Sequence, residues 1–367
     1  MVYDAYDIEL QVPSRVWKMR ERRVTGNASK VSMDRYRTLR RYLPWLGLIG
    51  ASLFGAFFLW IAINRVEWAG VWAVLSHANR TYLLAAFGIF VVALFLRGFR
   101  WKLLFRGVPV STRDLVLVET TAIGVNSITP IPVLDEPTRV GLLLIRGIPA
   151  GTVLATMAAM RTFELTIQAI IGAVGLFYLE PLRALAPYFI AAAVLAVLAL
   201  VALFGIGPLL RRVPMLARLR MVRDFSLGVQ LMRQAPWLTM LSLVMTALYA
   251  LMIGLSGWML GKAVDLPLGV LELTVISLAV IFFTDWIPGL PGAIGTFELV
   301  ALYFLGLWGI PTSAAFGFAI LLHILFFVPP LIVAALYLPY AGFRSVGAVM
   351  DLLRQRTPDT DVAAVHN

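Results

Sequence analysis

The stretch DWIPGLPGAIGTFELVAL, residues Asp285–Leu302, interrupts an apolar run with two carboxylates, two prolines and three glycines. Proline removes a backbone donor and blocks a continuous helix, whereas glycine permits turns and close approach of the backbone. Backbone groups freed at membrane depth must be satisfied by protein or by cavity water, because lipid offers no hydrogen bonds. The stretch therefore predicts a broken helix beside a polar cavity inside a membrane.

The composition of the whole chain also places it in a membrane. Of its 367 residues, 60% are hydrophobic and only 14% are charged. Apolar runs near 20 residues with few charges are typical of membrane-spanning helices. We predict an all-helical, polytopic membrane protein with six full spans, at 45–64, 81–98, 150–178, 187–207, 236–260 and 311–338.

Two further apolar regions, 114–147 and 268–309, are each interrupted by a proline-rich segment. Each reads as a helix of about 14–17 residues, a break, and a second helix of about 12–14 residues, so that either half reaches roughly 20 Å. This is short of the roughly 30 Å hydrocarbon core of a bilayer. Both regions therefore predict re-entrant helical hairpins.

The net charge of +11 follows a membrane topology rather than a nucleic-acid surface. Of the 31 Arg and Lys residues, 24 lie in the segments before 44, 97–113, 208–235 and 343–367, and four lie in the intervening connections. The positive-inside rule places the basic segments in the cytoplasm, provided that both hairpins return to their starting side. We predict a cell-membrane protein with cytoplasmic N- and C-termini and no nucleic-acid partner.

This layout divides the chain into a basic tail at 1–43, a transmembrane domain at 44–342 and a second cytoplasmic tail at 343–367. Residues 81–178 and 236–338 both read as span, hairpin, span, in opposite orientations. This pattern predicts an inverted repeat around a site near the membrane midplane. In the connector 208–235, apolar residues at helical spacing among arginines predict an interfacial helix on the anionic cytoplasmic leaflet, and the alternative is a basic soluble loop.

Several classes of chemistry are not expected. The chain has no cysteine, so it offers no disulfide, thiol nucleophile or thiolate metal site. Its three histidines are far apart in the sequence and form no metal-ligand pattern, and no phosphate-binding P-loop is present. We expect no metal, no cofactor and no direct coupling to ATP.

Arg161 and Glu164 are charged residues inside the span predicted at 150–178. A charged side chain near the bilayer centre costs about 2.5–3.5 kcal/mol on insertion scales, and more in some estimates. Their i, i+3 spacing puts both on one helical face, where they can pair. Either the pair fixes the helix register, or Arg161 meets an anionic group such as a lipid phosphate while Glu164 orients it.

The break at 126–139 holds a second set of candidate substrate-binding residues, Asn126, Glu136 and Arg139, together with Asp135, Pro130 and Pro132. Irregular backbone at depth is tolerated where it lines a polar cavity. The alternative is that the segment DEPTR forms an ordinary cytoplasmic loop.

The break at 285–298 adds Asp285, Gly292, Gly295 and Glu298 to the candidate site. The segment TFE opens the next helix, whose N-terminus offers free N–H groups and a partial positive charge. Glu298 either caps that helix or serves as a substrate or proton-coupling carboxylate. His323, in the last span, is either a hydrogen-bonded packing residue or a proton relay.

Both breaks resemble motifs of one family. The segment IPGLPGAIGTFE is similar to the P-x-x-P-G-G-[IL]-G-x-x-E motif of the lysylphosphatidylglycerol synthase transmembrane region, or flippase-like, family. The segment NSITPIPVLDEPTR resembles that family's N-x-x-x-P…G-E-x-x-R motif, with Asp135 in place of glycine and one extra residue. RTFE resembles its R-x-x-D, and His323 stands where an arginine is expected. The resemblance covers roughly residues 45–340.

The resemblance implies the membrane half of a lipid synthase-flippase, without the soluble aminoacyl-transferase half. We therefore expect a translocase for a phosphate-bearing membrane lipid, with or without an aminoacyl or glycan group. One alternative is a membrane glycosyltransferase that uses a polyprenyl-phosphate sugar. Another is a non-catalytic partner of a lipid-modifying enzyme. The sequence leaves open whether the chain forms homo-oligomers or binds such an enzyme.

Overall fold

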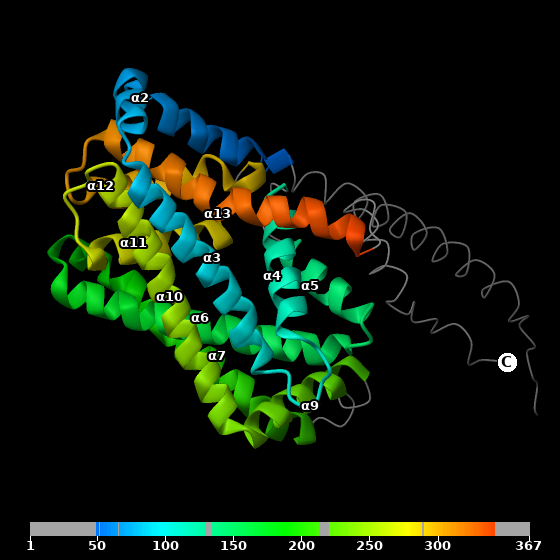
Figure 1. Cartoon of the computed structure of the whole chain (residues 1–367). Helices are drawn as coiled ribbons and strands as arrows, with labels where there is room; N and C mark the ends of the chain where they lie inside the picture. The colour runs from blue at the N-terminus through cyan, green and yellow to red at the C-terminus, as the bar shows by residue number, and fades with distance from the viewer. Residues whose placement is uncertain are drawn as a thin grey trace, which may run out of the picture. The chain divides into compact units, whose positions relative to one another are not determined.

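Figure 1 shows the computed structural model of the chain, which describes residues 49–50, 52–64, 66–128, 134–212, 220–287 and 290–341. Described residues from Ser52 onward belong to one unit. Its regular secondary structure is helical, and no strand occurs in the described ranges. The tails predicted at 1–43 and 343–367 lie outside these ranges.

Five helices within the described ranges are long and apolar enough to cross a membrane. The shortest has 23 residues and reaches about 34 Å at 1.5 Å per residue, beyond the roughly 30 Å of a bilayer core. The predicted spans from 81–98 onward are therefore confirmed as helices of spanning length, and the chain is a multi-pass membrane protein. The five helices are α3 (Arg80–Lys102), α6 (Ala150–Tyr178), α7 (Ala186–Arg212), α10 (Pro236–Ala263) and α13 (Thr312–Tyr340).

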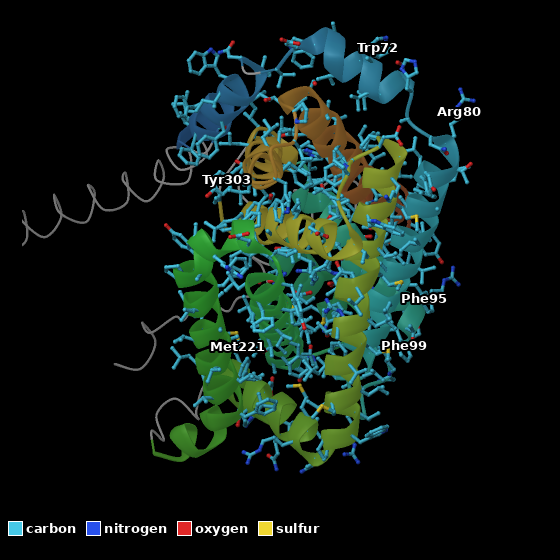
Figure 2. The ribbon with its side chains drawn as sticks, turned by 90° about the vertical axis from the view of Figure 1, so that its left-hand side faces the viewer. Trp72, Arg80, Phe95, Phe99, Met221 and Tyr303 are labelled. Atoms are coloured by element: carbon cyan, nitrogen blue, oxygen red, sulfur yellow. The ribbon has the colours of Figure 1, made fainter. Side chains whose placement is uncertain are left out.

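Large apolar side chains cover the outside of the helices, as a lipid environment demands. Phe95 on α3 exposes 58% of its surface and Tyr303 exposes 53%, and Figure 2 shows both on the outer side of the helices. A soluble monomer rarely exposes contiguous apolar patches larger than a few hundred Å². The outer surface thus matches hydrocarbon, and polar side chains gather inside.

The first predicted span, 45–64, takes a different form from the straight crossing that we expected. The structure describes a helix at Ser52–Asn64, which is followed at a bend of 84° by α2 (Trp68–Ser76). The indole of Trp68 meets the ring of Phe316 edge-on at 5.6 Å, and Val71 is buried. Segment 65–80, expected to be a loop, therefore contains a helix that packs on the start of α13.

Both predicted hairpin regions contain two short helices around a break. In the first, α4 (Thr112–Asn126) precedes α5 (Asp135–Leu144). In the second, α11 (Val270–Trp286) precedes the short 3-10 helix η2 (Pro291–Ala293) and α12 (Thr296–Gly306). The longest of these helices has 17 residues and reaches about 26 Å, less than a bilayer core. The helix–break–helix form is therefore confirmed for both regions.

Glycines let the first short pair pack tightly into the bundle. A Cβ on Gly98 of α3 would lie 2.6 Å from the Val116 backbone nitrogen of α4. A Cβ on Gly124 of α4 would lie 2.2 Å from the Pro330 carbonyl oxygen of α13. Small residues allow such close backbone approach between membrane helices. The end of α4, where the first break begins, is thereby fixed against α13.

The connector helix α9 (Arg220–Gln234) packs against a membrane-spanning helix, and its interfacial position stays a prediction. Its buried residues Val229 and Met232 lie in an apolar cluster with residues of α6. A Cβ on Gly228 would fall 2.8 Å from the Ala155 side chain, so the two helices are in close contact. The apolar face of α9 thus packs on protein, and Arg223 and Arg233 are exposed. Residues 213–219 lie outside the described ranges.

The contact between α4 and α13 predicts the effect of one added methyl group. We expect Gly124→Ala to lower the free energy of unfolding by about 1–3 kcal/mol, because the Cβ would overlap the Pro330 carbonyl. Gly88→Ala is the matched control, since a Cβ on Gly88 meets nothing within 4 Å. Thermal unfolding in detergent measures both, and an equal loss for both variants would contradict this account of the contact.

Candidate functional site

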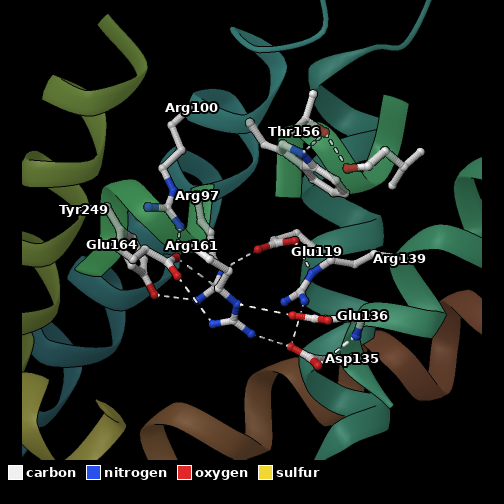
Figure 3. A network of polar contacts seen from close by, with 12 residues as sticks. Arg97, Arg100, Glu119, Asp135, Glu136, Arg139, Thr156, Arg161, Glu164 and Tyr249 are labelled. Atoms are coloured by element: carbon white, nitrogen blue, oxygen red, sulfur yellow. Dashed lines mark hydrogen bonds and ion pairs between the residues drawn. The ribbon is translucent and has the colours of Figure 1, made fainter. Parts of the chain in front are cut away.

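Arginine and carboxylate side chains from four helices meet inside the bundle (Figure 3). Charge buried among apolar helices is costly unless an opposite charge accompanies it. We call this group the arginine–carboxylate cluster. It comprises Arg97 and Arg100 from α3, Glu119 from α4, Asp135, Glu136 and Arg139 from α5, and Arg161 and Glu164 from α6.

Glu119 joins two arginines that come from different helices. Its Oε1 accepts a hydrogen bond from Nε of Arg97 at 2.6 Å, and its Oε2 accepts one from Nε of Arg139, also at 2.6 Å. Glu119 is 1% exposed and Arg139 is 3% exposed. Because both arginines use Nε, their terminal nitrogens remain for other acceptors, and Nη1 of Arg97 donates to the Tyr249 hydroxyl at 2.8 Å.

Glu164 has more partners than the one that we expected. The predicted pair with Arg161 is present, with Nη1 and Oε2 3.4 Å apart. The fully buried Arg100 also donates to Glu164, and Nη2 of Arg97 lies 3.9 Å from the same carboxylate. The guanidinium of Arg100 additionally sits over the Tyr249 ring, 4.5 Å from its centre. Glu164 is thus bound mainly by α3.

Asp135 opens α5 and connects that helix to α6. Its Oδ2 accepts from Arg139 at 2.7 Å and from Arg161 at 3.0 Å. Glu136 follows it and is more exposed, with an Oε1 that lies 3.7 Å from Nε of Arg161. Pro137 stands in the first turn of α5, where a missing N–H is tolerated. The alternative that DEPTR forms an ordinary loop is therefore wrong.

A cavity of about 110 Å³ lies beside the cluster. Its polar lining comprises mainly Arg97, Asp135, Arg139 and Arg161, together with Asn126 and Tyr249. The rest of the wall is mainly apolar and includes Phe90, Leu94, Ile253, Ile281, Phe297, Phe326 and Phe327. Both breaks reach this cavity, through Asn126 and through Gly292.

The second break is built on left-handed backbone. Gly292 has φ 73° and Gly295 has φ 89°, values that glycine adopts without strain. Ala293 has φ 59°, and it stands where the family motif quoted above has glycine. A Cβ on Gly292 would lie 3.1 Å from the Ser127 carbonyl oxygen, so the two breaks touch. A Cβ on Gly295 would lie 2.4 Å from the Gly55 carbonyl oxygen.

Glu298 and His323 form a separate buried pair. Oε2 of Glu298 accepts from the Gly295 backbone N–H at 2.7 Å, so the carboxylate does cap α12. Its Oε1 lies 2.6 Å from Nδ1 of His323. The imidazole packs against Phe297 and Phe327, with ring centres 4.6 and 4.4 Å apart. His323 is thus a hydrogen-bonded packing residue, although this geometry leaves a proton-relay role open as a hypothesis.

The predicted site residues divide into three groups. Asn126, Arg139, Arg161 and Gly292 line the cavity, while Glu136 and Glu164 belong to the adjoining cluster. Gly295, Glu298 and His323 form the cap and the buried pair behind the second break. Asp285 lies near the C-terminal end of α11, and its side chain is outside the part that the structure describes.

Four residues of the site were not predicted from the sequence. Arg97 and Arg100 were counted among the charges of a cytoplasmic segment, because the apolar run before them ends near 98. The structure extends α3 to Lys102, buries Arg100 fully and leaves the Arg97 side chain 12% exposed, at the cavity. Glu119 lies in the apolar run of α4, and its isolation there is a signal that could have identified it. Tyr249 on α10 carries no comparable signal.

Comparison with known families agrees with the motifs in both breaks. The family model described as the lysylphosphatidylglycerol synthase TM region matches residues 46–334. This range contains all described residues of the cluster, the cavity and the Glu298–His323 pair. A search of curated proteins found no match to the chain.

The burial of Glu119 predicts a large cost for removing its charge. We expect Glu119→Gln to lower the free energy of unfolding by about 3–5 kcal/mol, because two buried guanidinium groups lose their common counter-charge. Glu136→Gln removes only a partly exposed, long contact, and should cost about 0–1 kcal/mol. Denaturant unfolding in detergent compares the two variants. Equal losses would show that burial does not set the cost.

Proposed function

Because the chain belongs to the lysylphosphatidylglycerol synthase TM region family, we propose that it is a translocase that moves a phosphate-bearing lipid between leaflets. The family ties the chain to lipid modification or translocation in a membrane. Translocation by this chain, and the binding roles of the residues named below, are our proposal.

The observation that carries the proposal is the mixed lining of the cavity. Three arginines line it, and aromatic and aliphatic side chains line most of the remaining wall. An arginine guanidinium matches a phosphate through two parallel hydrogen bonds. Apolar walls suit the hydrocarbon part of the same molecule, and a concave, mainly apolar site with few polar groups is typical of ligand pockets. The phosphate of a lipid would bind the arginines, and the hydrocarbon chains of the same molecule would contact the apolar wall.

Arg139 and Arg161 are the proposed phosphate ligands. Both line the cavity, and Nη2 of Arg139 is buried with no hydrogen-bond partner among the described residues. A buried donor without a partner costs about 1–3 kcal/mol, and a ligand oxygen would satisfy it. In this proposal Glu119 and Asp135 orient the two arginines. Asp135 accepts hydrogen bonds from both of them.

The topology of the proposed translocase follows the charge pattern. We infer that α4–α5 enters from the cytoplasm and α11–α12 from outside, so that two re-entrant hairpins of an inverted repeat meet near the midplane. The exposed Arg223 and Arg233 of α9 would then face the anionic cytoplasmic leaflet. The N- and C-termini would lie on that same side of the cell membrane.

The role of Arg161 can be tested without unfolding the protein. Its removal leaves Asp135 paired with Arg139 and Glu164 paired with Arg100. We expect Arg161→Ala to slow lipid movement at least roughly tenfold, because a charge-assisted hydrogen bond contributes about 1.5–3 kcal/mol. Proteoliposomes with fluorescent lipid and a membrane-impermeant quencher measure the rate.

Arg183→Ala, at an exposed arginine outside the cluster, is the matched control. Unchanged transport in the folded Arg161 variant would refute the role of this residue. Absence of lipid movement by the wild-type chain, with every phospholipid tried, would count against the translocase itself.

The absence of cysteine from the sequence allows the topology to be tested directly. Ile128 and Ile294 lie at the two breaks and are 49% and 41% exposed. We expect an impermeant thiol reagent to label Ile128→Cys from the cytoplasm and Ile294→Cys from outside. The exposed positions Arg106 and His77, each changed to cysteine, report the cytoplasmic and external faces. Labelling of both break positions from one side would contradict the inverted repeat.

A further inference from the structure

The arginine–carboxylate cluster carries as many negative as positive groups. Four arginines face four carboxylates, and each carboxylate contacts at least one of the arginines. Ionised groups in such a pocket are stabilised only by one another, because the surrounding helices are apolar. A ligand that brings a net charge would upset this balance, whereas a ligand without net charge would preserve it.

The strength of the contacts falls from the inside of the cluster toward its edge. Glu119 is 1% exposed, and its two contacts measure 2.6 Å. At the edge, the side chains of Arg161 and Glu136 are 37% and 53% exposed, and their contact measures 3.7 Å. Exposed ion pairs contribute only about 0–1 kcal/mol. This outer pair is therefore the one that a headgroup can separate at least cost.

We propose that the cluster selects a zwitterionic phospholipid headgroup, with one phosphate and one ammonium group, and that Glu136 is the residue that accepts the ammonium. The inference rests on the proposed function, because it takes a membrane lipid to be the ligand. It adds the charge type of the headgroup and a specificity-determining residue.

The exchange of partners explains why both charges are needed. When the phosphate binds Arg161, the guanidinium leaves Glu136, and this carboxylate loses its cation. An ammonium on the same headgroup donates to Glu136 and restores the balance. A headgroup with phosphate alone leaves one unpaired carboxylate, and one with two ammonium groups leaves an unpaired cation. Both outcomes cost free energy, because a charge at the edge of the cluster then lacks its partner.

Glu136 can be changed without breaking the interior of the cluster. In Glu136→Gln, Arg161 keeps its contacts with Asp135 and Glu164. The deeper pairs of Glu119 do not involve Glu136. The variant therefore retains the fold and gives the site one more net positive charge, which should turn its preference toward an anionic headgroup.

The test uses soluble short-chain lipids as probes on the purified full chain in detergent. Dihexanoyl phosphatidylethanolamine is the zwitterionic probe and dihexanoyl phosphatidylglycerol is the anionic one, and calorimetry measures both affinities. We expect wild-type protein to bind the zwitterionic probe roughly threefold to fivefold more tightly, the difference that one partly exposed ion pair supports. In Glu136→Gln the ratio of the two affinities should fall to about one or below.

Glu180→Gln is the matched control, because Glu180 is exposed and lies outside the cluster. It should leave the ratio unchanged. Equal or tighter wild-type binding of the anionic probe, or an unchanged ratio in Glu136→Gln, would overturn the inference. Failure of this inference can be told apart from failure of the proposed function. A protein that transports phosphatidylglycerol in vesicles remains a translocase, but one with another headgroup specificity.

Discussion

The cost of burying charge among apolar helices governs the interior of this protein. Glu119 offsets that cost for two arginines, because it accepts hydrogen bonds from the Nε atoms of Arg97 and Arg139. The contact joins α3 to α5 through α4, and it adds to the close packing of α3 on α4 at Gly98. It also leaves the terminal nitrogens of both arginines for other acceptors, and both residues line the cavity.

The cavity combines this charge with an apolar wall, and both are assembled from helices far apart in the chain. The polar lining comes mainly from α3, α4, α5, α6 and α10, and the apolar lining comes from α3, α4, α10, α11, α12, α13 and the second break. The site therefore exists only when these helices pack together. Tight contacts such as that between Gly124 and Pro330 position α4 against α13.

Hydrophobic run length predicted the spans well, since five helices of spanning length lie where the sequence placed them. Proline and glycine predicted both breaks, because their backbone chemistry is local. The bend after Asn64 was missed, since it depends on Trp68 packing against Phe316. The packing of α9 on α6 was missed for the same reason.

For the site, local pattern located Arg139, Arg161 and Glu164 and the pairing of the last two, but not their partners on α3 and α4. A charge inside a long apolar run is visible in the sequence, whereas Arg97 and Arg100 near the end of such a run look like cytoplasmic charges. Their burial is decided by contacts with Glu119 and Glu164, 22 and 64 residues away in the chain. Tyr249 is 152 residues from Arg97, and no local pattern reports such a contact.

The contact between Gly292 and the Ser127 carbonyl has a mechanical consequence. With only hydrogen in place of a side chain, Gly292 lets the second break rest directly on the first. Because the breaks are in contact, one of them can move toward the other only if the second moves as well. Movement of one break away from the other would instead open this contact.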